Sequence, residues 1–205
     1  MAWTTPRTWT TSELVTASIM NTHIRDNLNY LYSGKEAFYV PASAMRAATT
    51  NPCGGVTQTE LTAGQAEIIY RTFDKDADEF AIFQVVMPKK WNLGTVSFQA
   101  SWFASDANST GVTIGLDAVA VADGEDMDVA FGTTVVITDN QQANQYDLLR
   151  TAESASVTIA GTPGEGDMIN FRVSRDVSDV NDNLAADLWL AGITIYFTSN
   201  QHFEA

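Results

Sequence analysis

Apolar residues near the start of the chain recur at helical spacing. Ala17, Met20, Ile24, Leu28 and Leu31 follow one another at intervals of three and four residues. This spacing places them along one face of a helix of about four turns, with polar residues opposite. A single helix of this length is marginally stable alone in water, so we expect its apolar stripe to be buried against another surface.

The two ends of this helix carry recognisable signals. Residues 9–14 fit a capping box with a hydrophobic staple, and Thr16 offers a second start one turn later. We favour Thr16 as the N-cap residue. Gly34 would end the helix as its C′ residue, because glycine readily adopts the left-handed conformation that this position needs. Trp3 and Trp9 lie in a preceding arm too short to bury them by folding alone, so they are expected to dock on another surface.

Beyond residue 34 the pattern changes to the alternation of polar and apolar residues that is typical of half-buried strands. The alternation runs through residues 95–102, 112–118, 169–173 and 189–197. Residues 80–87 are instead apolar at both parities, which predicts a central strand covered on both faces. Trp102 and Trp189 share parity with the apolar residues of their strands, so both are predicted to lie in the core.

Turn-forming residues separate these runs, and no long helical pattern follows residue 34. One such stretch, residues 161–167, contains three glycines and a proline and is interpreted as a hairpin turn. Short strands with this punctuation predict a mainly β fold: an antiparallel jelly-roll-like β-sandwich preceded by an N-terminal arm and one amphipathic α-helix. We place the anchoring arm and helix in residues 1–34 and the sandwich in residues 35–205.

The charge of the chain narrows its possible partners. With a formal net charge of -14, it is predicted to bind neither nucleic acid nor an anionic membrane surface, since both need Lys and Arg to displace counterions. No apolar run reaches the length of a signal peptide or a membrane-spanning helix, so we expect a soluble protein made in the cytoplasm. Cys53 is the one cysteine, which excludes an intrachain disulfide.

Residues able to support catalysis or metal binding are few. His23 falls inside the predicted helix and His202 near the C-terminus, and neither has a companion at metal-ligand spacing. Residues 74–78 match the opening of a calcium loop, but Glu79 replaces the glycine that its bend needs, which excludes an EF-hand. We interpret the acidic clusters between strands as solvated turns that oppose edge-to-edge pairing; whether one of them holds Ca²⁺ stays open. The sequence thus predicts no catalytic, cofactor-binding or metal-binding residues and no cofactor.

The segment from Trp9 to Leu28, WTTSELVTASIMNTHIRDNL, resembles the N-terminal segment of many tailed-bacteriophage virion structural proteins of the tail-fibre-like and head-decoration-like kinds. Residues 88–95 and 171–176 are similar to the same group. The resemblance implies a β-sandwich that assembles around a three-fold axis, with the N-terminal region holding the particle and the sandwich facing outward.

These observations together predict a virion protein that is not an enzyme. We expect a homotrimeric capsid decoration (cement) or head-fibre protein, attached by its N-terminal region to other virion proteins such as the major capsid protein. The alternatives are a tail-fibre or receptor-binding module that recognises a host-surface glycan and, less favoured, a depolymerase. Instead of packing on sister helices or on another protein, the helix could also cover the sandwich of its own chain, since one helix per domain can do either. The predicted assembly interface consists of Trp3, Trp9, Leu14, Ala17, Met20, Ile24, Leu28 and Leu31.

Overall fold

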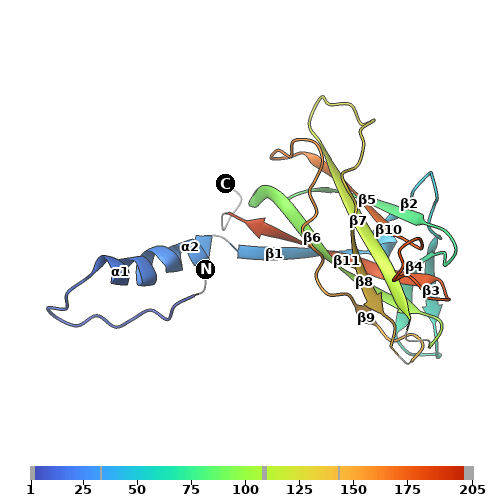
Figure 1. Cartoon of the computed structure of the whole chain (residues 1–205), viewed down its shortest axis with the longest axis horizontal. Coiled ribbons are helices and arrows are strands. Elements are labelled where there is room, and N and C mark those ends of the chain that lie inside the picture. Colours follow the sequence, from blue (N-terminus) through green and yellow to red (C-terminus); the bar gives the residue numbers. More distant parts are fainter. Residues whose placement is uncertain (1–2, 33, 108–109, 143, 201–205) are drawn as a thin grey trace.

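The computed structural model describes residues 3–32, 34–107, 110–142 and 144–200 of the chain. It has two parts: a β-sandwich, and an N-terminal arm and helix that project from one end of it (Figure 1). Within the described ranges, no helix is long and apolar enough to span a membrane. The candidate residue His202 lies outside the described residues.

The predicted helix forms, with a widened turn in its middle. It comprises α1 (Ala17–Met20), a π-helical turn (Asn21–Arg25) and α2 (Asp26–Tyr32). Thr16 is its N-cap, as predicted, because its hydroxyl oxygen accepts a hydrogen bond from the backbone N–H of Ile19 at 3.3 Å. The helix ends at Tyr32, and Gly34 is the first residue of the following strand.

Six antiparallel strands form the first sheet, called sheet A. Strand β11 (Leu188–Ser199) pairs along one edge with β6 (Trp91–Ala104), while β1 (Gly34–Pro41) and β4 (Glu67–Phe73) share its other edge. The sheet is extended beyond β4 by β3 (Val56–Glu60) and beyond β6 by β9 (Leu149–Arg150).

Five antiparallel strands form the second sheet, sheet B. Their spatial order is β2 (Arg46–Ala47), β5 (Glu79–Val86), β10 (Met168–Arg175), β7 (Gly111–Val121) and β8 (Val135–Asn140). A short 3₁₀ helix (Ala42–Ala44) carries the chain from sheet A to sheet B.

The strand order is that of a jelly roll. Among the strands from β4 to β11, the order β4-β11-β6-β9 forms most of sheet A, and the order β5-β10-β7-β8 forms most of sheet B. The chain thus crosses repeatedly between the layers, and each sheet covers the apolar face of the other. The predicted mainly β, jelly-roll-like sandwich with an N-terminal helix is confirmed.

The runs of sequence that were predicted to be strands are strands. The alternating runs lie in β6, β7, β10 and β11, and residues 80–87 lie in β5 up to Val86. However, β7 is buried at every position rather than at every second one. Its outward Asp117 is covered by Arg172, which forms a bidentate ion pair with it and lies between the rings of Phe80 and Phe131.

The prediction that residues 80–87 are covered on both faces is wrong. Phe83 faces the core, but Val86 on the outer side of β5 is 58% exposed. Phe80 and Ile82, also on the outer side, are half-buried beside Arg172 of the neighbouring strand. Phe80 and Ile82 therefore pack beside the long side chain of Arg172, and within the described ranges no second layer of strands or helices covers this side.

Trp102 lies in the core, as predicted. Its side chain is fully buried, and its indole Nε1 donates a hydrogen bond to Asp139 Oδ2 at 2.9 Å. The indole N–H needs such a partner, because a buried donor without an acceptor destabilises the fold.

Trp189 does not lie in the core, so this prediction is wrong. The register between β11 and β6 shifts between Leu190 and Gly192, where β11 contains one extra residue. This bulge changes which parity faces inward. Trp189 therefore points outward, where its ring stacks on Tyr70 with 4.2 Å between centroids. The buried residues of β11 are Leu188 and Leu190 before the bulge, and Ile193, Ile195 and Phe197 after it.

Residues 161–167 form a turn but not a hairpin. Gly161 and Gly166 have positive φ angles, which explains glycine at both positions. The chain enters the turn from Ala160, which forms a parallel bridge with Val119, and leaves it into β10. The two flanking segments are therefore not antiparallel partners of each other.

A buried ion pair fixes the loop that follows β10. Arg175, which is fully buried, donates from Nε and Nη2 to the two carboxylate oxygens of Asp182 at 3.0 and 2.8 Å. It also donates to the backbone carbonyl oxygens of Phe73, Leu184 and Ala186. The interpretation of all acidic clusters as solvated turns is therefore wrong at Asp182, whose carboxylate is buried.

We predict that Asp182→Asn strongly destabilises the sandwich. The variant leaves the Arg175 guanidinium buried without its counter-charge, so we expect a loss of about 3–5 kcal/mol in the free energy of unfolding. Chemical denaturation followed by tryptophan fluorescence measures it. The control is Asp76→Asn, which removes the exposed partner of Lys75 and should cost less than about 1 kcal/mol. Equal losses in the two variants would contradict this role of the buried pair.

Candidate functional site

Every residue predicted for the assembly interface is exposed in the single chain. The exposed fraction reaches 79% for Leu14 and 59% for Leu28. Apolar side chains gathered on one short element gain free energy when a partner surface removes them from water. We call this set the N-terminal apolar surface. Its members are Trp3, Trp9, Leu14, Ala17, Met20, Ile24, Leu28 and Leu31.

The arm folds back along the helix and is held there by Asn27, which is buried. Asn27 Oδ1 accepts a hydrogen bond from the backbone N–H of Thr4 at 3.0 Å, and its Nδ2 donates to the carbonyl oxygen of Thr4 at 2.8 Å. The Trp3 ring lies beside Tyr30, with 5.9 Å between the ring centroids. The arm and helix therefore form one hairpin-shaped unit, which Figure 1 shows beyond the end of the sandwich.

Contacts within the arm shape its return toward the helix. Arg7 forms an ion pair with Glu13 and lies over the Trp9 ring, 5.2 Å from its centroid. The Glu13 carboxylate also accepts a hydrogen bond from the backbone N–H of Thr10 at 3.2 Å. These contacts fix the bend that precedes Thr16 while Trp9 stays partly exposed.

The π-helical turn brings Met20, Ile24 and Leu28 closer to one line. In this turn the backbone N–H of Asp26 donates to the carbonyl oxygen of Asn21, five residues earlier. Met20, Ile24 and Leu28 are spaced by four residues, which is more than one α-helical turn, so they would drift around a regular helix. The wider turn takes up additional residues and reduces this drift.

The helix does not cover its own sandwich. It points away from the sheets (Figure 1), and the side chains of its stripe remain exposed. The alternative in which the helix packs on the sandwich of its own chain is therefore not the arrangement found.

We predict that Asn27→Ala frees the arm from the helix. The backbone N–H and C=O of Thr4 lose their partners, at a cost of about 1–3 kcal/mol. Trypsin should then cut after Arg7 several-fold faster, because the arm opens more often. Limited proteolysis with mass spectrometry measures the rate. The control Ser18→Ala, at an exposed position of the same helix, should leave the cleavage rate unchanged. Equal cleavage rates in the two variants would show that Asn27 does not hold the arm against the helix.

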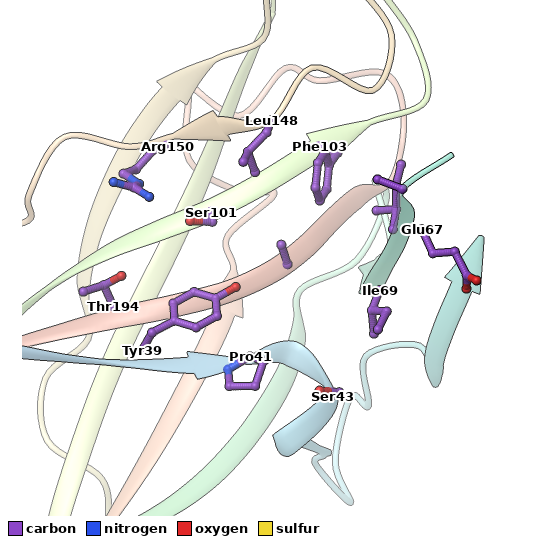
Figure 2. A pocket seen from close by; sticks show the side chains of 13 residues that line it. Tyr39, Pro41, Ser43, Glu67, Ile69, Ser101, Phe103, Leu148, Arg150 and Thr194 are labelled. Atoms are coloured by element: carbon purple, nitrogen blue, oxygen red, sulfur yellow. The ribbon is translucent and has the colours of Figure 1, made fainter. Parts of the chain in front are cut away.

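A groove on the outer face of sheet A is a second candidate site, and it was not predicted from the sequence. It has a volume of about 680 Å³ and crosses β1, β11, β6 and β9, with β4 at one end. Figure 2 shows the side chains that line it. Small residues, Ala191 and Ser101, leave a hollow that is bordered by the larger Tyr39, Phe103 and Leu148.

The Tyr39 side chain lies over the backbone of Gly192. A Cβ atom added at this glycine would lie 2.4 Å from the Tyr39 hydroxyl oxygen and 2.5 Å from Cζ, so a larger residue would displace the ring. Tyr39 is nevertheless 50% exposed. Partial burial raises the pKa of the Tyr39 hydroxyl, although the positive charge of Arg150 opposes the rise, so the hydroxyl remains neutral at neutral pH.

The polar residues of the groove include one group of each charge. Arg150 extends from β9, and Glu67 lies at the opposite end on β4 (Figure 2). The side chains of Ser43, Ser101 and Thr194 add hydroxyl groups to the lining. The groove thus combines an apolar lining with several donors and acceptors, which is typical of sites for small polar ligands.

His23 and Cys53, the residues considered for catalysis, are not among those that line the groove. His23 lies in the π-helical turn, and its buried Nδ1 has no hydrogen-bond partner in the described part of the chain. Cys53 is buried, and burial raises the pKa of its thiol, although Arg71 opposes this rise. Within the described ranges, no three His, Cys, Asp or Glu side chains gather closely enough to hold a metal ion. What these ranges present is two surfaces suited to binding.

Sequence reasoning missed two features of these surfaces, for different reasons. Asn27 occupies a polar position of the helix, and its partner Thr4 lies 23 residues away, with no motif that connects them. The groove needs side chains from five strands, so it becomes visible only once the strand order is known.

Comparisons with known proteins give no family. No protein-family model and no curated protein matches the chain. The isomalto-dextranase of Arthrobacter globiformis T6, solved with panose, is 14% identical over 79% of this chain and 23% of its own, with a TM-score of 0.47. The CBM22-2 xylan-binding domain of Paenibacillus barcinonensis Xyn10C is 11% identical over 78% of this chain and 98% of its own, with a TM-score of 0.44. The CBM36-1 domain of a multidomain xylanase from the hindgut metagenome of Trinervitermes trinervoides is 11% identical over 78% and 96%, with a TM-score of 0.41. Similarities this weak carry no argument about what the chain binds.

Proposed function

We propose that this chain is a non-enzymatic structural protein of a tailed-phage particle, a homotrimeric capsid decoration or head-fibre protein that attaches through its N-terminal region. The observation that carries the proposal is the N-terminal apolar surface. Its residues, selected from the sequence, are all exposed on a unit that projects from the sandwich. Such a surface favours association, because apolar area leaves water when a partner covers it.

The sandwich has no comparable need of a partner. Its core lies between two sheets that cover each other, so it is expected to fold without help. The helix, in contrast, is too short to be stable alone. This difference supports attachment by the N-terminal unit and outward display of the sandwich.

Sister copies of the helix fit the stripe on its exposed side. Met20, Ile24 and Leu28 lie near one line, and a narrow apolar seam of this kind is typical of helices that pack in parallel bundles. Arg25 and Asp26, which pair at 2.8 Å, lie off the stripe and stay in water. The apolar residues of the arm are then available to bind the phage particle, and the major capsid protein is the proposed partner.

We predict that Ile24→Asp separates the trimer into monomers. The charge would be buried in the seam without a partner, which strongly disfavours association. Sedimentation equilibrium of the full chain measures the mass, and circular dichroism checks that the sandwich still folds. Ser18→Asp adds the same charge at an exposed position off the stripe and should leave the trimer intact. A wild-type chain that stays monomeric at high concentration would refute the assembly role.

We also predict that phage particles stripped of this protein burst at a lower temperature than complete particles. Each subunit that binds only the assembled lattice adds stability to it, and adding back the purified protein should restore the original temperature. Thermal release of DNA, followed with a fluorescent dye, measures the effect. Equal bursting temperatures, together with antibody label on the tail in electron micrographs, would favour the tail-fibre alternative.

A further inference from the structure

Among the residues that the structure describes, Arg150 is a cation without an ion-pair partner, in a sequence where cations are scarce. The chain has 11 Lys and Arg residues against 25 Asp and Glu residues. Eight of the cationic side chains form ion pairs, and Arg71 is held by backbone carbonyl oxygens. In the described part of the chain, the side chains of Arg150 and Arg46 form neither ion pairs nor hydrogen bonds, and of the two Arg150 lies in the groove of sheet A. Its N–H donors are thus available to a bound molecule.

Tyr39 supplies an aromatic surface beside this arginine. Because Gly192 has no side chain, the Tyr39 ring packs over β11 and is still half exposed toward the groove. An aromatic ring held on a sheet in this way offers a platform on which an apolar ring face can stack. A sugar ring has such a face, formed by its C–H groups, while its hydroxyl groups project from the rim.

The charges of the groove favour an uncharged ligand. Arg150 and Glu67 carry opposite charges, and Ser101 and Thr194 add hydroxyl groups that both donate and accept hydrogen bonds. A purely apolar ligand would cover Arg150, Ser101 and Thr194 without supplying hydrogen-bond partners for them. A polyanion would be repelled by the chain as a whole, whose net charge is -14. Sugar hydroxyl groups match the mixture of donors and acceptors without adding charge.

We infer that this groove binds a neutral oligosaccharide, with one sugar ring on Tyr39 and hydroxyl groups of the same or the next sugar hydrogen-bonded to Arg150. The volume of about 680 Å³ suits a chain of a few sugars. The inference does not rest on the proposed function, because the groove lies on the sandwich and the assembly surface lies on the N-terminal unit. Either can therefore fail without the other.

The test uses the full chain and a panel of hexasaccharides. Isothermal titration calorimetry is run with neutral hexamers of glucose, mannose, galactose, xylose and N-acetylglucosamine, and with hexagalacturonate as the charged arm. At least one neutral hexamer should bind, and hydrogen exchange should show protection of β1, β9 and β11. Tyr39→Ala and Arg150→Gln should each weaken this binding by roughly three- to tenfold, while Tyr39→Phe should keep most of the affinity.

Two control variants distinguish the groove from the rest of the surface. Arg46→Gln removes the same charge from β2 in sheet B, and Val86→Ala removes an exposed apolar side chain from β5. Both should bind the sugar as the wild type does. The inference is overturned if no neutral hexamer binds, if Arg46→Gln weakens binding as much as Arg150→Gln, or if hexagalacturonate binds more tightly than the neutral sugars.

Discussion

The two sheets of the sandwich cover each other's apolar faces, and within the described residues neither sheet covers the apolar stripe of the N-terminal helix. The inner faces form one core in which residues such as Phe98 and Phe171 are fully buried. A helix of about four turns cannot bury its own stripe, and its arm packs on one flank through Asn27 while the stripe stays open. These apolar residues are exposed, so they would add to stability if another surface covered them.

One extra residue in β11 shapes the outer face of sheet A, where the groove lies. Before the bulge, β11 pairs with β4 and turns Trp189 outward; after it, β11 pairs with β1 and Gly192 lies beneath Tyr39. A bulge bends the strand and increases its local twist. The groove lies at this change of neighbour, where β1 ends near Pro41 and β4 begins near Glu67. The β-bulge thus accompanies a groove on a sheet face that would otherwise be flatter.

How much was predictable depended on whether the signal was local. The alternation in β6 and the cap at Thr16 involve neighbouring residues, so the sequence was enough to predict them. The same reasoning wrongly placed Trp189 in the core. The bulge changes which residues of β11 face inward, and the pattern of apolar residues does not reveal it. The partner of Arg175 and the residues around Tyr39 come from distant segments, and only the order of strands brings them together. The sequence predicts that the stripe needs a covering surface, because its apolar face cannot be buried within one helix, but it does not identify that surface.

Assembly and sugar binding, as proposed, would reinforce each other. A groove open to solvent with one aromatic platform is expected to bind weakly, since much of the ligand remains in water and the gain must offset the loss of its freedom of motion. Joining three chains at the helix seam holds three grooves together, and decoration of one particle holds many such trimers. A surface coated with the sugar then meets further grooves at an effective concentration set by their spacing, so weak single sites give slow release of the whole particle. Such binding requires a rigid sandwich that keeps each groove in shape without help from neighbouring chains. The buried pair of Arg175 and Asp182 contributes to this rigidity, because it holds the loop that leads from β10 into β11, the central strand of the groove.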